Sequence, residues 1–382
     1  MKKRMKSLDV LRGLTIACMI LVNTPGTWSH IYAPLCHAEW NGMTPTDMVF
    51  PLFMFMMGVS MYISLRKYEF KLHKELVLKI LKRTFLIFII GTALYVFGGF
   101  MYSLNSAFHQ ENLVESPWQV AMASLGRIRI LGVLQRLALC YGIGSLLVCI
   151  ICHKCLPYFI TILLVGYYFI LATCNGFVYG PENILSMVDL KVLGINHIYN
   201  DHGIDPEGVL STIPAVAHVL IGFLIGKVCI EIKEPAEKMN RLFRYGFLLM
   251  LVGLLLTDFC PLNKKVWSST YVLVSCGLST SLLATLYWLI DVKGDKFTQR
   301  WSILFEVFGV NSLFSYVLSQ FLCVVFDTLP MSVQSIHGGI YRILTVVLSD
   351  GKFASLLYAV LFVSIIWAMS YMLYRKKIYI KL

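Results

Sequence analysis

The sequence predicts an all-α, polytopic membrane protein with about ten transmembrane helices and both termini in the cytoplasm. Hydrophobic residues make up 58% of the 382 residues, charged residues only 14%, and the mean hydropathy is +0.72. A water-soluble globular chain carries about 25% charged residues. The apolar runs are long and continuous, as in helices that span a membrane, and they lack the alternation of barrel strands. We therefore expect a single transmembrane domain over residues 1–382.

Ten apolar runs define the expected helices. The first is interpreted as a retained helix and not as a signal peptide, because no small-residue cleavage site follows it. In chain order the predicted spans are approximately 10–27, 47–66, 84–102, 129–152, 156–174, 213–230, 244–260, 271–290, 304–326 and 353–374.

Basic residues fall mainly on one predicted face of the membrane. With an even number of helices, 25 of the 33 Lys and Arg residues lie at the termini and in the loops on the same side. The positive-inside rule makes that side cytoplasmic. The net charge of +12 is thereby explained by topology and by contact with lipid headgroups, so we expect no nucleic-acid partner. The predicted location is the cell (inner) membrane.

Three arginines run against this pattern. Arg127, Arg129 and Arg136 crowd the outer start of the predicted fourth helix. Arg129 and Arg136 are seven residues apart, which would place them on one helical face. Two interpretations stay open: they hold an anionic group such as a phosphate, or they form ion pairs inside the bundle.

The polar stretch from His37 to Asp47 joins the first two predicted helices. His37 is its one side chain that titrates near neutral pH, and the carboxylate of Asp47 opens the next apolar run. Ionisable groups at membrane depth are costly and usually serve a function. The alternative interpretation of His37 is an ordinary histidine of an interfacial loop.

Two other features allow more than one interpretation. The outer loop 175–212 concentrates acidic, amide and aromatic groups, including Asp205 and Glu207, which suit the hydroxyls and ammonium of a sugar but also suit a solvated turn. Cys149, Cys152 and Cys155 have a spacing known from metal sites, yet no second ligand cluster is visible, so we predict no metal. Nucleotide-binding and hydrolase motifs are absent from the sequence.

Several segments, in this order, resemble the heparan-alpha-glucosaminide N-acetyltransferase family, and the resemblance extends over nearly the whole chain. The segments are SLDVLRG at 7–13, VN at 22–23, HAEWNG at 37–42, DMVFPLFMFMMGVS at 47–60, RILGVLQRL at 129–137, DPEG at 205–208, LNKKVWS at 262–268, DVKG at 291–294 and YRKK at 374–377.

The resemblance implies transfer of acetyl from cytosolic acetyl-CoA to the amine of a terminal glucosamine on the far side. Acyl transfer to an amine needs a base and a donor for the developing oxyanion. His37 suits the base or a transient acyl acceptor, and Asn23 suits the oxyanion or the orientation of the amine. Asp47 would orient His37 or hold the substrate ammonium.

The remaining assignments follow from the same hypothesis. Arg129, Arg136 and Gln135 are assigned to acetyl-CoA, while Trp40, Asn41, Asp205 and Glu207 are assigned to the acceptor. Expected partners are an amino sugar or glycan, membrane lipids and a second copy in a homodimer. A transporter of a sugar or lipid-linked intermediate would use the same polar cavity, and a non-catalytic scaffold is disfavoured by the clustered polar groups.

Overall fold

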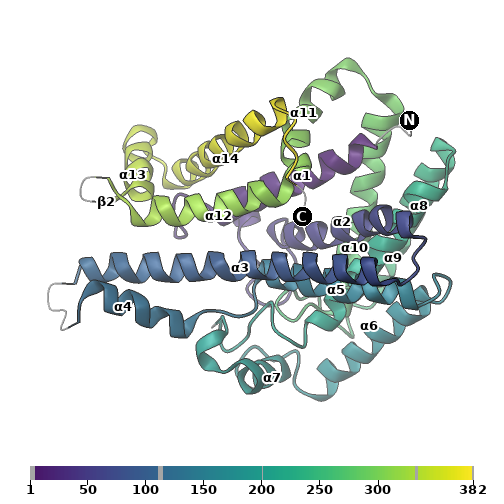
Figure 1. Ribbon diagram of the computed structural model, residues 1–382, viewed down its shortest axis with the longest axis horizontal. Coiled ribbons are helices and arrows are strands. Elements are labelled where there is room, and N and C mark those ends of the chain that lie inside the picture. The colour runs from purple at the N-terminus through teal and green to yellow at the C-terminus, as the bar shows by residue number, and fades with distance from the viewer. Residues whose placement is uncertain (1–4, 111–114, 200, 332–333, 381–382) are drawn as a thin grey trace.

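The computed structural model describes residues 5–110, 115–199, 201–331 and 334–380. Lys2, Lys3, Arg4 and Lys381 of the predicted cytoplasmic charge, and Asn200 of the polar outer loop, lie outside the described residues. The helices are α1 Lys6–Asn23, α2 Val49–Leu65, α3 Lys74–Phe108, α4 Pro117–Ala123, α5 Val133–Ile150, α6 Leu156–Thr173, α7 Ile184–Leu193, α8 Thr212–Glu231, α9 Pro235–Leu255, α10 Ser269–Leu286, α11 Lys296–Val310, α12 Ser312–Thr328, α13 Ile336–Leu348 and α14 Gly351–Arg375 (Figure 1). A hairpin of two-residue strands, β1 Pro330–Met331 and β2 Gln334–Ser335, precedes α13.

The predicted all-α class is confirmed. Each predicted range falls on helical structure, although the boundaries shift by several residues. Among the described residues, seven helices are long and apolar enough to cross a membrane: α2, α3, α5, α6, α8, α10 and α14, with α2 and α10 extended by their flanking turns. The helices α1 and α9, which carry more charge, are not among them.

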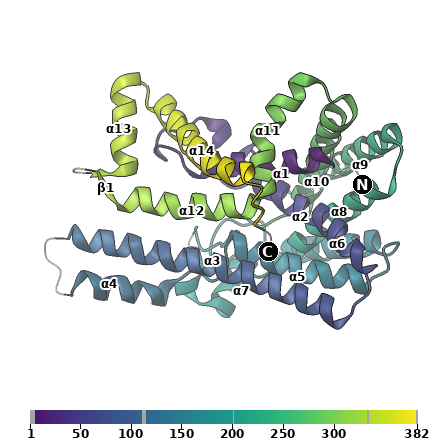
Figure 2. The same cartoon turned by 45° about the horizontal axis from the view of Figure 1, so that its top comes forward.

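The prediction of one continuous ninth helix over 304–326 is wrong. The chain leaves the helical conformation at Asn311, and α11 and α12 meet there at an angle of 78°. The Asn311 side chain binds the backbone of the C-terminal segment through Ile378 and Ile380. If this bent pair counts as one span, the described chain has eight candidate spans. Figure 2 shows α11 rising steeply away from α12.

Three short helices, α4, α7 and α13, lie in segments predicted as loops. Each has a local start signal: Ser116 and Gln119 form a capping box for α4, and the side chains of Asn183 and Ser335 cap α7 and α13. At 7 to 13 residues they are too short to register as spans in a hydropathy pattern.

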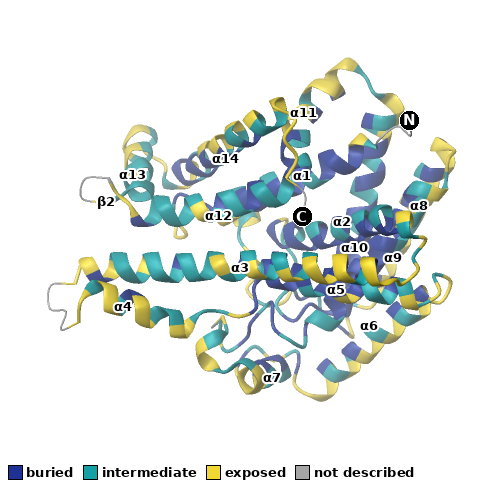
Figure 3. Ribbon diagram, viewed as in Figure 1, coloured by how far each residue is buried: buried dark blue, intermediate teal, exposed yellow. Residues whose placement is uncertain are grey.

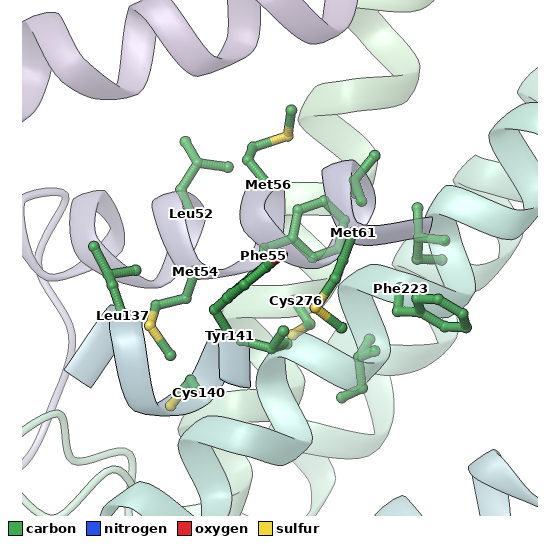
Figure 4. Close-up of a cluster of buried hydrophobic side chains, with 14 of the residues drawn as sticks. Leu52, Met54, Phe55, Met56, Met61, Leu137, Cys140, Tyr141, Phe223 and Cys276 are labelled. Atoms are coloured by element: carbon green, nitrogen blue, oxygen red, sulfur yellow. The ribbon is translucent and has the colours of Figure 1, made fainter. Parts of the chain in front are cut away.

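The most buried helices are α2, α8 and α10, which form the centre of the bundle (Figure 3). Phe55 and Met61 of α2, Tyr141 of α5, Phe223 of α8 and Cys276 of α10 meet in this core (Figure 4).

Close packing of α2 on α8 brings two loop segments together at one end of the bundle. A Cβ atom on Gly222 would fall 2.3 Å from the Phe55 carbonyl oxygen, so glycine lets the two backbones touch. Asp47 lies at the N-terminal end of α2, and the segment from Asp205 to Ser211 lies at the N-terminal end of α8.

Candidate functional site

His37 and Asp47 form a hydrogen-bonded pair at the N-terminal end of α2. His37 Nδ1 lies 2.6 Å from Asp47 Oδ1. The His37 side chain is 45% exposed, whereas Asp47 is 1% exposed. Because a carboxylate only accepts, Nδ1 carries the proton of this contact, and in the neutral ring Nε2 then keeps its lone pair. A buried carboxylate that fixes the tautomer of an exposed histidine is the arrangement of a general base.

Asp47 is held firmly by its own loop. Its Oδ2 accepts hydrogen bonds from the backbone N–H of Ala38 at 3.1 Å and of Thr44 at 3.0 Å, and from the Thr44 hydroxyl at 3.0 Å. The Tyr271 hydroxyl of α10 donates to the Asp47 carbonyl at 2.6 Å. These bonds fix the orientation of the Asp47 carboxylate, and the hydrogen bond to Asp47 in turn orients the His37 ring.

Lys264 joins this pair from the loop between α9 and α10. Its Nζ lies 3.1 Å from His37 Nδ1, 3.5 Å from His37 Nε2 and 3.5 Å from Asp47 Oδ1, so ammonium and imidazole share one carboxylate. Burial lowers the pKa of Lys264 below its usual value, against the opposing effect of Asp47. Sequence reasoning counted Lys264 only as an outer basic residue, although the LNKKVWS segment marked its loop.

The loop that carries Lys264 is hydrogen-bonded to the His37 loop. The buried Asn263 donates from Nδ2 to Asn41 Oδ1 at 3.2 Å, and the Gly42 backbone N–H donates to the Leu262 carbonyl at 2.7 Å. Asn41, predicted to bind the acceptor, therefore also fastens Lys264 beside His37.

Arg129 pairs with both carboxylates of the DPEG segment. Its Nη2 lies 2.5 Å from Asp205 Oδ1 and 2.6 Å from Glu207 Oε2, and its guanidinium stacks over the Tyr199 ring at 4.9 Å. Burial alone would raise the pKa of Glu207, but the charge and hydrogen bond of Arg129, together with the charges of Arg136 and Lys264, outweigh it and lower that pKa. The structure thus brings a residue assigned to acetyl-CoA together with two residues assigned to the acceptor.

The prediction that Arg129 and Arg136 share a helical face is wrong. The helix α5 begins at Val133, and Arg129 lies in the non-helical segment before it. That segment passes close beneath Tyr95, where a Cβ atom on Gly132 would fall 2.2 Å from the Tyr95 hydroxyl.

Arg136 and Gln135 are fully buried in α5. Arg136 Nη2 donates to the Gly208 carbonyl and to the Ser211 hydroxyl, and the guanidinium lies 5.3 Å from the Trp267 ring. Gln135 Nε2 approaches Thr92 Oγ1 of α3 at 3.5 Å. Gln135 thus points toward α3, and Arg136 points toward the segment that precedes α8.

Trp40 belongs to an aromatic cluster beside the pair. Its ring stacks on Tyr179 at 4.6 Å and its Nε1 donates to the Phe177 carbonyl at 3.0 Å. Lys265 Nζ lies 2.6 Å from Asp201 Oδ2 and donates to the Tyr179 hydroxyl at 2.9 Å. This cluster joins the 175–212 loop to the His37 loop.

Asn23 is the last residue of α1 and is exposed. Its Nδ2 donates to the Met19 carbonyl of the same helix at 2.8 Å. In the part of the chain that the structure describes, no hydrogen bond joins Asn23 to His37 or Asp47. The roles predicted for Asn23 in the reaction at His37 are therefore not supported by a direct hydrogen bond between the two side chains.

Within the described ranges, no group of three or more His, Cys, Asp or Glu side chains is arranged to hold a metal ion. Cys149, Cys152 and Cys155 are free cysteines there.

Asp189 of α7 lies against the segment that precedes α8, and the titration of its carboxyl group is testable. Its Oδ1 accepts from the Val209 backbone N–H at 2.7 Å, and burial raises its pKa to about 6. An unfolded aspartate titrates near 3.9. The stability that the neutral form contributes is therefore complete below pH ~4 and is lost as the pH rises through about 6.

We expect Asp189→Asn to remove this component, measured as the difference in melting temperature from the unaltered protein in detergent between pH 4 and 8. The exposed neighbour Glu182, changed to Gln, is the control. An identical pH profile for Asp189→Asn and the unaltered protein would contradict the role of this carboxyl group.

Fold and site together define a polytopic helical membrane protein with an acid–base pair on a loop at one end of its bundle. The sequence profile of the heparan-alpha-glucosaminide N-acetyltransferase catalytic family matches residues 4–255, and the chain belongs to this family. The resemblance found from the motifs is thereby confirmed.

Two curated relatives carry the name heparan-alpha-glucosaminide N-acetyltransferase. The protein of Mus musculus is 27% identical over 373 residues, and that of Homo sapiens is 27% identical over 377 residues. Each alignment covers 82% of this chain but only 53% and 52% of the respective relative. The chain thus spans about half the length of these proteins.

Proposed function

We propose that the chain is a transmembrane N-acetyltransferase that moves acetyl from cytosolic acetyl-CoA to the amine of a glucosamine-type sugar on the outer side of the membrane. The observation that carries the proposal is the 2.6 Å contact between His37 and the buried Asp47, in a chain of this family. Residues 1–382 act in this proposal as a single acyltransferase domain.

In the proposed reaction His37 Nε2 accepts a proton from the amine while the amine nitrogen attacks the thioester carbonyl carbon. The carbon–nitrogen bond forms, the carbon–sulfur bond breaks, and the proton passes from His37 to the departing thiolate. Asp47 stabilises the imidazolium that exists in between. The Lys264 ammonium beside the ring is suited to the developing oxyanion, and Asn23 is assigned to the orientation of the amine.

The path of acetyl-CoA is proposed along two adjoining cavities on the opposite side of the bundle. A cavity of about 450 Å³ is rimmed by four basic residues, Lys67, Lys79, Lys82 and Arg83, which suit the phosphates of CoA. A second cavity of about 380 Å³ shares Ser64, Arg83 and Tyr141 with it and runs between α2, α3, α5 and α12. Their shared wall supports one continuous route for a long, thin ligand.

This proposal gives different roles to the three residues assigned to acetyl-CoA, which are Arg129, Arg136 and Gln135. Leu134 of α5 lines the inner cavity, and Gln135 next to it has a buried Oε1 without a hydrogen-bond partner in the described chain. Gln135 suits the pantetheine amides near the end of the route. Arg129 and Arg136 then lie between the proposed acetyl-CoA route and the proposed acceptor site.

For the acceptor we assign Trp40 and Asn41 to the sugar ring, because both belong to the loop of His37. Asp205 and Glu207 contribute through Arg129, which neutralises them. A glycan acceptor agrees with the name of the two relatives.

The decisive experiment is incubation of the purified protein with acetyl-labelled acetyl-CoA and glucosamine. We expect labelled N-acetylglucosamine and free CoA in equal amounts, and no transfer to glucose, which lacks the amine. Uptake of glucosamine into proteoliposomes without acetylation would favour the transporter instead.

The proposed sidedness gives a separate prediction. Both termini are cytoplasmic and His37 is outside the inner membrane, from the charge distribution of the loops. In a background without native cysteines, we expect a membrane-impermeant thiol reagent to label Glu39→Cys on intact cells whose outer membrane, if present, is permeabilised. Lys154→Cys, an exposed position on the opposite side, should react only after the inner membrane is broken. The reverse pattern would invert the topology.

A further inference from the structure

An open apolar groove lies between α6, α8 and α9, which gather at one side of the molecule in Figure 1. Its volume is about 680 Å³. The wall is mainly aliphatic, with Leu164, Leu224, Ile225, Leu248, Leu249 and Val252 among its members. Such a wall offers acyl chains a surface that is open to the bilayer core.

The charged side chains of the groove gather near the ends of α8 and α9 that face the proposed cytoplasmic side. Lys227 and Glu231 are one turn apart on α8 and therefore share a face. Glu231 Oε1 accepts from the Tyr62 hydroxyl at 2.7 Å. Arg241 is already paired with Glu237 at 2.6 Å, whereas Lys227 forms no ion pair with any described residue. The groove thus ends in one available cation beside one carboxylate.

We propose that this groove binds an amino-phospholipid, whose headgroup joins a phosphate to a primary ammonium. The phosphate meets Lys227, the ammonium donates to Glu231, and the acyl chains lie along the aliphatic wall. An anionic phospholipid without an amine offers Glu231 no ammonium, so the carboxylate would lie beside a phosphate of the same charge. A choline headgroup carries no N–H to donate.

The groove is linked to the site through α8. This helix packs on α2 through Gly222, and it begins beside the Ser211 hydroxyl that Arg136 binds. A lipid that fills the space between α8 and α9 braces the helix on which both contacts depend. Bound amino-phospholipid is therefore expected to raise the melting temperature of the protein.

Native mass spectrometry of the detergent-purified full chain tests the proposal. The probes are phosphatidylethanolamine, phosphatidylcholine and phosphatidylglycerol with identical acyl chains. We expect phosphatidylethanolamine to bind at least five-fold more tightly than the other two. Equal binding of all three lipids, or a preference for phosphatidylglycerol, would overturn the proposal.

Two headgroup variants separate the contacts. Lys227→Gln should weaken phosphatidylethanolamine and phosphatidylcholine alike, by about five-fold, the factor for roughly 1 kcal/mol per basic residue near lipid phosphate. Glu231→Gln keeps an acceptor for Tyr62 but should abolish the preference for phosphatidylethanolamine over phosphatidylcholine. Lys233→Gln, an exposed neighbour outside the groove, is the matched control and should change neither affinity.

A steric variant tests the acyl-chain wall. Leu248→Trp should fill part of the groove and reduce lipid binding, whereas Phe247→Trp, an exposed position of α9 outside the groove, should not. The same spectra report the mass of the protein. If Leu248→Trp dissociates a dimer and leaves lipid binding unchanged, a second copy of the chain occupies the groove and the lipid proposal fails.

Discussion

Replacement of His37 by alanine is expected to lower kcat for acetyl transfer by about 10²–10⁴-fold, the usual cost of losing one acid–base group. The variant should still fold, because the ring is 45% exposed and Asp47 keeps its bonds to the Ala38 and Thr44 backbone. Steady-state kinetics on purified protein give kcat, and thermal unfolding in detergent reports the fold.

The matched control is His30→Ala, an exposed histidine of the same loop whose ring is 3.4 Å from the Ser29 hydroxyl. It should keep near-normal turnover. Asp47→Asn should also lower kcat, because an amide can present its N–H to Nδ1 and so favour the wrong tautomer of His37. Wild-type turnover in purified His37→Ala would remove the histidine from the mechanism.

Properties that depend on local sequence could be predicted without a structure. The membrane class follows from composition, and the helices follow from apolar runs. His37 and Asp47 lie only ten residues apart in one loop, so their grouping was visible from the sequence. The break at Asn311 was missed because one polar residue scarcely alters the mean hydropathy of a long apolar run.

The rest of the site depends on contacts between distant segments. Lys264 is 227 residues from His37, and the partners of Arg129 are 76 and 78 residues from it. The apolar pattern continues back to Arg129 and so predicted a helix there, whereas α5 begins only at Val133, after the extended Gly132. Contacts between segments this far apart in the chain depend on how the whole bundle packs, which hydropathy and periodicity patterns do not reveal.

Arg129→Ala is expected to destabilise the protein by about 3–5 kcal/mol, because it leaves the carboxylates of Asp205 and Glu207 buried without their cation. Sequence reasoning allowed Arg129 to anchor acetyl-CoA or to form an ion pair, and its bonds to both carboxylates now favour the ion pair. Arg127→Ala, in the same segment but exposed, is the matched control and should change stability by no more than about 0.5 kcal/mol.

Kinetics measured beside thermal unfolding in detergent decide between the two roles. If Arg129 is an ion-pair residue, Arg129→Ala should melt early, and the KM values for acetyl-CoA and for the amine should move together in whatever fraction stays folded. Neutralising the whole cluster by Arg129→Met with Asp205→Asn and Glu207→Gln should recover part of the lost stability, since no charge then stays unpaired. A stable Arg129→Ala protein with a selectively raised KM for acetyl-CoA would instead return this arginine to the CoA path, because a lost ground-state contact with one substrate changes the KM of that substrate alone.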